Sequence, residues 1–289
     1  MIARPTRRSL RRFAAAFAGA VLVWLLLTSG AARWLIETAD RRWWHEAVKD
    51  TVGRWYWKED WRAVPPPPTG LDYDWLSRAP APLRIAHALG HAPGTAGANT
   101  LAAAQQSLDG GARLLEVDIW LDGAELRCHH GPEAPAPLDA QACTLERLLV
   151  LTQAAGAHLV LDIKTDFGST GEAILARVSP TAARTLIFQL YQPAHLALFA
   201  RWSEHWQLPG PIVTAYLAHR SLEHLAAAAE ACGIRVLTVP VARLPALSRR
   251  AGTRVLVHPV SSCQQLQEQL EQGADGAYMP STLRCGPGA

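Results

Sequence analysis

Two carboxylates in the middle of the chain stand where they could act together. Glu116 and Asp118 are separated by one residue within the otherwise apolar run LLEVDIWL. Because side chains alternate along a β-strand, both carboxylates would lie on the same face of one strand. A carboxylate turned toward an apolar core is costly unless it is paired or binds a cation. The pair therefore predicts a metal site, and an edge strand that turns both residues to solvent is the alternative.

A later run, HLVLDIKTD, repeats this spacing with opposite charges. Asp162 and Lys164 would share one face at the end of a strand. Asp162 would complete the cation site, and Lys164 would stabilise negative charge on an anionic substrate. A structural ion pair between the two is the alternative. His87 ends the first strand-like run, LRIAH, and we expect it at the same end of the sheet.

A turn signal brings a histidine toward the carboxylates. Asp122 and Gly123 form an Asp-Gly pair, which is typical of a two-residue turn between antiparallel strands. With these residues at the turn, Glu116 pairs with His129, and opposed residues share a face with Cβ atoms about 5 Å apart. A single bulge would put His130 there instead. A histidine beside carboxylates could serve as a general acid or base.

Further polar and aromatic side chains are candidates for substrate contacts, because they follow predicted strands or lie on the hairpin. These candidate residues are Gln189, Tyr191, Tyr216, His258 and Trp120.

The residues after 82 alternate strand-like and helix-like runs, which is the pattern of repeated βα units around a parallel sheet. The strand-like runs are 83–87, 114–119, 125–129, 159–163, 186–190, 212–216, 236–239, 255–258 and 276–279, and the helix-like runs include 101–108, 145–155, 194–202, 222–232 and 263–272.

Nine strands are one more than an eightfold barrel needs. The run 125–129 is the return arm of the hairpin, so eight parallel strands remain. This predicts a TIM (β/α)8 barrel of the α/β class, with the site at the carboxyl ends of the strands. An open doubly wound sheet is the second choice, but the sequence has no GxGxxG or GxxxxGK[ST] phosphate loop.

The amino-terminal part predicts export. Five arginines precede an uncharged run over residues 13–32, long enough as a helix to span about 30 Å of hydrocarbon. Residues 1–35 are thus a transmembrane signal anchor or a cleaved signal peptide. The positive-inside rule then places the rest beyond the inner membrane, in the periplasm of a bacterial-type envelope, or secreted after cleavage. Residues 36–80 form a Trp-rich membrane-proximal segment with a proline linker, and residues 81–289 form the barrel.

Charge and cysteine content are consistent with this organisation. The net charge of +3 depends on the amino-terminal arginines, so a nucleic-acid partner is not indicated. The five cysteines form no CxxC pair, which argues against a thiolate zinc site. Cys128 and Cys143 flank a Pro-rich loop and are expected to form a disulfide. The odd count leaves at least one thiol free or intermolecular.

The barrel region resembles the glycerophosphodiester phosphodiesterase family and, more loosely, the phosphatidylinositol-cleaving phospholipases and sphingomyelinase-D-like toxins. The matching segments, in order, are IAH (85–87), NTLAAA (99–104), EVD (116–118), DG (122–123), His129, TLERL (144–148), LDIK (161–164) and GADGAYM (273–279). The resemblance implies a phosphoric diester hydrolase in which His87 and His129 are the acid–base pair and Lys164 lies near the phosphate. It also implies a Mg²⁺ or Ca²⁺ held by Glu116, Asp118 and Asp162.

The sequence departs from the family pattern at four positions. Ala88 stands where the family has arginine, Ala98 replaces the glutamate before Asn-Thr, His130 replaces aspartate, and Asp162 replaces glutamate. The Asp-x-Lys pattern and the missing glutamate are similar to the toxin-like branch. The resemblance therefore implies cleavage of glycerophosphodiesters or (lyso)phospholipid headgroups at a membrane. A catalytically degenerate envelope barrel that binds lipid headgroups or a protein partner is the alternative.

Overall fold

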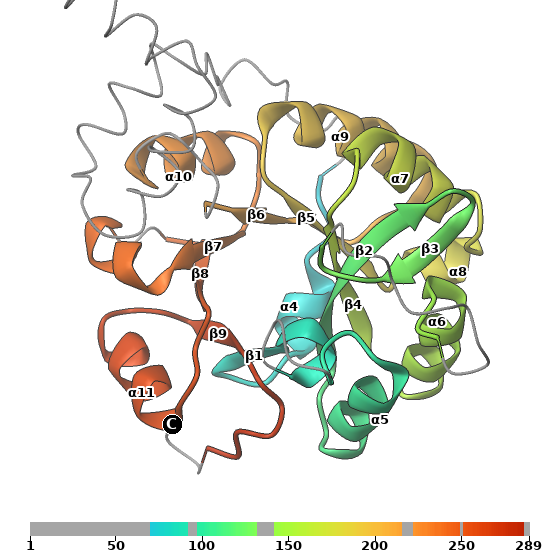
Figure 1. Ribbon diagram of the computed structural model, residues 1–289. Coiled ribbons are helices and arrows are strands. Elements are labelled where there is room, and N and C mark those ends of the chain that lie inside the picture. The colour runs from blue at the N-terminus through green and yellow to red at the C-terminus, as the bar shows by residue number, and fades with distance from the viewer. Residues whose placement is uncertain (1–69, 92–96, 132–141, 216–221, 249–250, 286–289) are drawn as a thin grey trace, which may run out of the picture.

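The computed structural model describes residues 70–91, 97–131, 142–215, 222–248 and 251–285. Within these ranges eight parallel strands and one antiparallel strand form a single sheet (Figure 1). The strands are β1 (Leu83–Ala86), β2 (Leu114–Asp122), β3 (Glu125–Cys128), β4 (His158–Ile163), β5 (Leu186–Leu190), β6 (Ile212–Thr214), β7 (Val236–Pro240), β8 (Arg254–His258) and β9 (Gly276–Met279).

The sheet closes on itself because β1 pairs in parallel with both β2 and β9. The strand β3 is antiparallel to the end of β2 and lies outside the closed ring, as Figure 1 shows. The predicted TIM barrel is therefore confirmed, and the open doubly wound sheet is excluded. All nine predicted strand runs correspond to strands, with ends that differ by at most three residues.

Helices surround the barrel in Figure 1 and cover the outward faces of the strands. They are α5 (Leu101–Asp109), α6 (Leu145–Ala154), α7 (Phe167–Leu175), α8 (Pro180–Ala183), α9 (Pro193–Trp206), α10 (Leu222–Ala231) and α11 (Cys263–Glu271). Side chains of Thr100, Thr144 and Ser262 accept a backbone N–H at the starts of α5, α6 and α11, which satisfies donors that a helix start leaves open.

The helix α7 was not among the predicted helices. Its sequence FGSTGEAIL contains two glycines, which disfavour a helix by roughly 1 kcal/mol each. Packing explains why the helix forms, since Gly171 lies so close to the ring of Trp202 that a Cβ atom there would clash. The exposed side chain of Asp166 caps the start by accepting the Ser169 N–H at 2.9 Å.

The amino-terminal end of the barrel is closed by a short segment around α4 (Asp74–Arg78), which is seen within the ring of strands in Figure 1. Tyr73 donates its hydroxyl hydrogen to the Pro211 carbonyl at 2.9 Å, and the Trp75 indole donates to the Gly210 carbonyl at 3.1 Å. Both rings are buried. They pack on an apolar layer inside the barrel, made of Leu83, Ile85, Leu114, Val160, Ile187, Ile212, Val236 and Leu256.

Two disulfides tie surface segments to the barrel. Cys128 and Cys143 are bonded, as predicted, and join the end of β3 to the segment before α6. A second bond, between Cys263 and Cys285, was not predicted. Cys232 is the remaining thiol and is buried.

The predicted membrane segment, residues 13–32, lies outside the described residues. Among the helices that are described, none is long and apolar enough to cross a bilayer. The domain bounds at residues 35 and 80 therefore stay predictions.

Candidate active site

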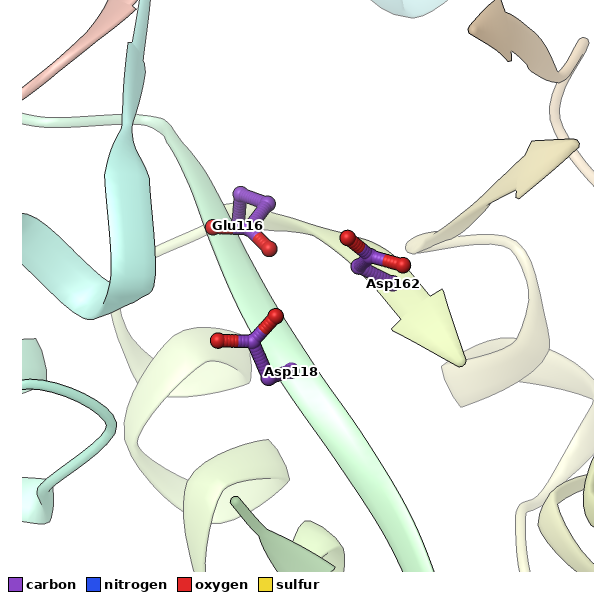
Figure 2. Close-up of side chains that lie close together, drawn as sticks. All are labelled: Glu116, Asp118 and Asp162. Atoms are coloured by element: carbon purple, nitrogen blue, oxygen red, sulfur yellow. The ribbon is translucent and has the colours of Figure 1, made fainter. Parts of the chain in front are cut away.

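Three acidic side chains converge inside the carboxyl end of the barrel. Glu116, Asp118 and Asp162 each offer one carboxylate oxygen, and these oxygens all lie within 4.8 Å of one another. Figure 2 shows the three side chains turned toward one another, two from β2 and one from β4. Their residues are only 1%, 2% and 6% exposed. The alternative in which the β2 carboxylates face solvent is therefore wrong.

The register of two neighbouring strands produces this convergence. Asp118 on β2 is level with Asp162 on β4, and Glu116 is level with Val160. Residues two apart on a strand share a face, so these side chains point into the barrel together with those of the apolar layer below them. The interior thus changes from apolar at the amino end to polar at the carboxyl end.

Lys164 provides a positive charge between two of the carboxylates. Its Nζ lies 2.9 Å from Asp118 Oδ1 and 2.7 Å from Asp162 Oδ2. Burial lowers the pKa of this ammonium, but the neighbouring Asp162 and Asp118 carboxylates more than offset it, so the pKa is raised. Lys164 is charged at neutral pH, and the four ionised side chains would carry a net charge of −2.

Like charges and burial act most strongly on Glu116. Burial raises its pKa well above the ordinary value, and the Asp118 and Asp162 carboxylates raise it further. The backbone N–H of Ala88 donates to Glu116 Oε2 at 2.6 Å and partly opposes this shift. A positive charge brought to the site would restore the ionised form of Glu116.

The loop after β1 supplies two contacts that the sequence analysis missed. Ala88 has φ +45° and Leu89 has φ +63°, a left-handed turn that aims the Ala88 N–H at Glu116. Asn99 is buried; its amide donates to Asp118 Oδ2 at 2.7 Å, and its oxygen accepts the Asp118 N–H at 3.1 Å. The Asn-Thr segment was noted only as part of a motif.

Two histidines meet at the same end of the barrel. Nε2 of His87 lies 2.9 Å from Nε2 of His258 and 3.8 Å from Glu116 Oε2. Each imidazole is also nearly perpendicular to the ring of Tyr278, in a T-shaped contact. Burial lowers the pKa of His87 to about 4, opposed by Asp118 and assisted by Lys164 and His130. Burial lowers the pKa of His258 to about 3, assisted by His87, Lys164 and His130. Both rings are therefore neutral at neutral pH.

The predicted hairpin register is wrong by two residues. Asp122 pairs with Glu125, so the turn consists of Gly123 and the residue after it, rather than Asp122 and Gly123. Continuing this register places His129 opposite Asp118 instead of Glu116, and the His129 N–H donates to the Asp118 carbonyl at 2.9 Å. Because the register is shifted by two residues, each side chain of the return strand still lies on the predicted face of the sheet.

The two adjacent histidines therefore have different surroundings. The ring of His129 is partly buried and faces Trp120, with ring centroids 6.3 Å apart. His130 is exposed, and it contributes to the lowered pKa of both His87 and His258. Trp120 is partly exposed on the extended arm of the hairpin.

Of the remaining candidates, Gln189 and Tyr191 contact protein groups of the site. The Tyr191 hydroxyl donates to Asp162 Oδ2 at 2.7 Å, and the Gln189 amide donates to the Tyr191 oxygen at 2.5 Å. Tyr278, which the sequence analysis did not select, donates to Gln189 Oε1 at 2.7 Å. Tyr216 lies outside the described residues.

The donor set fits a hard divalent cation. Mg²⁺ and Ca²⁺ both prefer carboxylate oxygens, and neither requires nitrogen or sulfur ligands. Oδ1 of Asp162 is buried and has no hydrogen-bond partner among the described residues, although Oδ2 of the same carboxylate has two. An unpaired buried carboxylate oxygen is costly unless something positive meets it. The net charge of −2 would be balanced by one divalent ion.

Comparison with known proteins gives a match in three dimensions only. No family model matches the sequence, and no curated protein matches it. Solved structures do match. One is a phosphodiesterase from Oleispira antarctica in complex with the product sn-glycerol-3-phosphate; it is 16% identical, the match covers 72% of this chain and 96% of that one, and the TM-score is 0.52.

Two other structures match similarly. A protein from Silicibacter pomeroyi assigned as a glycerophosphoryl diester phosphodiesterase is 16% identical over 75% of this chain and 92% of its own, with a TM-score of 0.56. A glycerophosphodiester phosphodiesterase from Parabacteroides distasonis is 14% identical over 69% of this chain and 93% of its own, with a TM-score of 0.52. The chain therefore has the barrel fold of solved glycerophosphodiester phosphodiesterases.

Proposed function

We propose that the chain is a metal-dependent phosphoric diester hydrolase that cleaves glycerophosphodiesters or (lyso)phospholipid headgroups. The observation that carries the proposal is the group of Glu116, Asp118, Asp162 and Lys164, which lies with two histidines at the carboxyl end of the barrel. Active sites of TIM-barrel enzymes lie at this end. The likeness to phosphodiesterase structures, one of which contains sn-glycerol-3-phosphate, supports the substrate class.

Glu116, Asp118 and Asp162 would hold Mg²⁺ or Ca²⁺. When bound, the cation would neutralise charge on the phosphate and so favour attack on phosphorus. Lys164 would add a second positive charge on the Asp118 and Asp162 side of the site. The Asn99 amide and the Ala88 N–H hold Asp118 and Glu116 in place for this role.

Displacement at phosphorus requires the attacking and leaving oxygens to be roughly in line. An acid and a base that serve them must then stand on opposite sides of the phosphorus. His87 and His258 are in contact, so they serve one side only. His129 or His130, on the hairpin, would serve the other side. In this scheme one histidine takes a proton from the attacking hydroxyl and the other protonates the leaving oxygen.

The attacking hydroxyl distinguishes two products. Attack by water gives a phosphomonoester and an alcohol. Attack by a neighbouring hydroxyl of the substrate gives a cyclic phosphate and an alcohol. Both reactions need the same acid, base and charge neutralisation, so the assay must separate the two products.

The proposal includes the cellular location of the barrel. We place the barrel beyond the inner membrane, anchored by residues 13–32 or released after cleavage. Two disulfides among the described residues support an oxidising compartment.

Activity with added Mg²⁺ or Ca²⁺ on a panel of glycerophosphodiesters and lysophospholipids tests the proposed function. We expect turnover that is lost in chelator and restored by excess cation. The double variant Glu116→Ala/Asp118→Ala should be inactive, and full activity in this variant would contradict the proposal.

A degenerate barrel is the second candidate, because Ala88 and Ala98 stand where the family has arginine and glutamate. Such a protein would bind lipid headgroups or a protein partner without cleaving them. Cation-dependent thermal stabilisation with no turnover on any substrate of the panel would favour it.

A further inference from the structure

We infer that Tyr191, Gln189 and Tyr278 form a hydrogen-bonded strut that presents Oδ1 of Asp162 to the cation, rather than contacting the substrate. This inference rests on the proposed function, because it assigns positioning residues to the proposed metal site. The strut crosses the barrel interior from β9 to β5 and then to β4. Its three links are all shorter than 3 Å.

The direction of each link follows from the carboxylate. An ionised carboxylate only accepts hydrogen bonds, so the Tyr191 hydroxyl must donate to Asp162 Oδ2. The Tyr191 oxygen then accepts, and only the amide nitrogen of Gln189 can donate to it. The amide oxygen of Gln189 therefore faces the other way and accepts from the Tyr278 hydroxyl. No group in this series can reverse its role without breaking a link.

The strut also determines which oxygen of Asp162 remains available. Oδ2 accepts from Tyr191 at 2.7 Å and from Lys164 at 2.7 Å. Oδ1 is buried and has no hydrogen-bond partner among the described residues. Because two donors fix Oδ2, the carboxylate plane is held and Oδ1 keeps one direction. This is the arrangement expected of a carboxylate that would hold a cation through Oδ1, because ligating carboxylates are themselves hydrogen-bonded.

The far end of the strut is anchored in the barrel wall. Gln189 is 5% exposed and Tyr278 is 1% exposed. The Thr238 hydroxyl on β7 lies 3.4 Å from the Tyr278 oxygen and donates to it. The strut thus links Asp162 to strands on the opposite side of the barrel. Gln189 and Tyr191 use their polar atoms within it, which leaves substrate contacts to other side chains.

The test is a calorimetric titration of the full chain with MgCl₂ and with CaCl₂, in the absence of substrate. Tyr191→Phe removes one donor to Asp162 Oδ2 and keeps Lys164. We expect the cation affinity to fall about 10- to 100-fold, as is common when an outer partner of a metal ligand is removed. Gln189→Met breaks the middle of the strut and should lower the affinity by a smaller factor. If Tyr191→Phe does not fold, the affinity of Gln189→Met alone tests whether the strut positions Asp162.

Tyr73→Phe is the matched control. It also deletes the hydroxyl of a tyrosine that donates a hydrogen bond, but Tyr73 lies at the amino end of the barrel and donates to the Pro211 carbonyl. We expect this variant to bind the cation as the wild type does. An equal fall in affinity in Tyr73→Phe would overturn the inference, because the effect would then be a general loss of stability.

Asp162→Asn separates the inference from the proposed function. If Asp162→Asn loses binding while Tyr191→Phe and Gln189→Met bind like the wild type, the strut has no positioning role and the metal site stands. If Asp162→Asn binds like the wild type, or the wild type binds neither ion, both the strut and the proposed metal site are wrong. Weakened binding in both strut variants, with Tyr73→Phe unchanged, supports the inference.

Discussion

Nε2 of His87 lies 2.9 Å from Nε2 of His258, so one hydrogen bond joins two imidazoles from opposite ends of the barrel sequence. One ring must donate and the other must accept at this distance. His258 thereby restricts both the orientation of the His87 ring and the nitrogen that carries its proton.

The first prediction follows from this contact. His87→Phe should lower kcat about 10²- to 10⁴-fold, the usual contribution of a general acid or base. His258→Phe should lower kcat about 10-fold and leave KM unchanged, because His258 acts through His87. Steady-state kinetics on one glycerophosphodiester measure both effects. A rise in KM with kcat intact would instead make His258 a substrate-binding residue.

The second prediction concerns stability in acid. His87 has an ordinary pKa of 6.5 and a folded value of about 4. The unfolded chain therefore binds this proton at higher pH than the folded chain does. The free energy of unfolding is therefore unaffected by this group above pH 6.5. It decreases as the pH falls toward 4, by up to about 3 kcal/mol.

The corresponding measurement is urea unfolding between pH 7 and pH 4. The double variant His87→Phe/His258→Phe should lose less stability over this range than the wild type. If both proteins lose the same amount, then the two imidazoles do not bind protons more weakly in the folded state.

The third prediction is that Glu116→Gln stabilises the metal-free protein at neutral pH. The folded pKa of Glu116 is raised, so its contribution to stability is present at low pH and is lost as the pH rises above 4.5. Glutamine keeps an oxygen that accepts the Ala88 N–H and removes the cost of ionisation. We expect a rise in Tm of a few degrees in chelator, about 1 kcal/mol, and loss of Mg²⁺ binding. A lower Tm in chelator would contradict this reading of Glu116.

The fourth prediction is that Mg²⁺ partly replaces the positive charge of Lys164. Lys164→Met leaves Asp118 and Asp162 without their ammonium partner, and breaking such a pair costs roughly 3 kcal/mol or more when it is well buried. Lys164 is 21% exposed, so we expect about 1–2 kcal/mol. Saturating Mg²⁺ should reduce this deficit, because the site without the ammonium is more negative and should bind the cation more tightly, and tighter binding to the folded state stabilises it more. Thermal unfolding with and without Mg²⁺ checks this, and a deficit that Mg²⁺ leaves unchanged would be the contrary result.

The fifth prediction compares the effects on Tm and kcat of removing each of the two disulfides. Cys128 immediately precedes His129, and its bond to Cys143 closes a loop of separation 15, worth about 3 kcal/mol by chain entropy. The Cys263–Cys285 bond has a separation of 22 and lies on α11 and the carboxyl-terminal segment. Cys128→Ser/Cys143→Ser should lower both Tm and kcat, because the hairpin histidines lose their anchor.

The control variant is Cys263→Ser/Cys285→Ser. It should lower Tm by a similar amount and leave kcat near that of the wild type when assayed well below both transitions. Equal kcat values in the two double variants would show that the first disulfide does not position the hairpin histidines.

Strand parity explains how much of the site could be predicted from the sequence. Glu116, Asp118 and Asp162 needed only the alternation of side chains and the parallel order of strands to be placed together. The same reasoning put His87 and His258 at strand ends. These features depend on local geometry that repeats every two residues, so small errors in strand ends did not alter them.

The parts that could not be predicted depend on non-repeating geometry. The hairpin turn uses the residue after the Asp-Gly pair, and composition alone does not fix which two residues occupy the turn. The Ala88 N–H reaches Glu116 from a turn in which Ala88 and Leu89 adopt left-handed conformations, for which neither residue type gives a signal. Tyr278 appeared in the sequence only as part of the GADGAYM segment, and only the barrel closure brings its hydroxyl to Gln189.

The closed amino end of the barrel has a kinetic consequence. Among the described residues, Tyr73, Trp75 and the apolar layer above them fill the amino end of the barrel, so an ion and a substrate of the proposed reaction would both reach the site from the carboxyl end. Glu116 lies deep behind that entrance and is only 1% exposed. A cation would therefore have to enter before the substrate and leave after the product, which makes the order of addition compulsory. Raising the substrate concentration before Mg²⁺ is added should then slow the onset of activity.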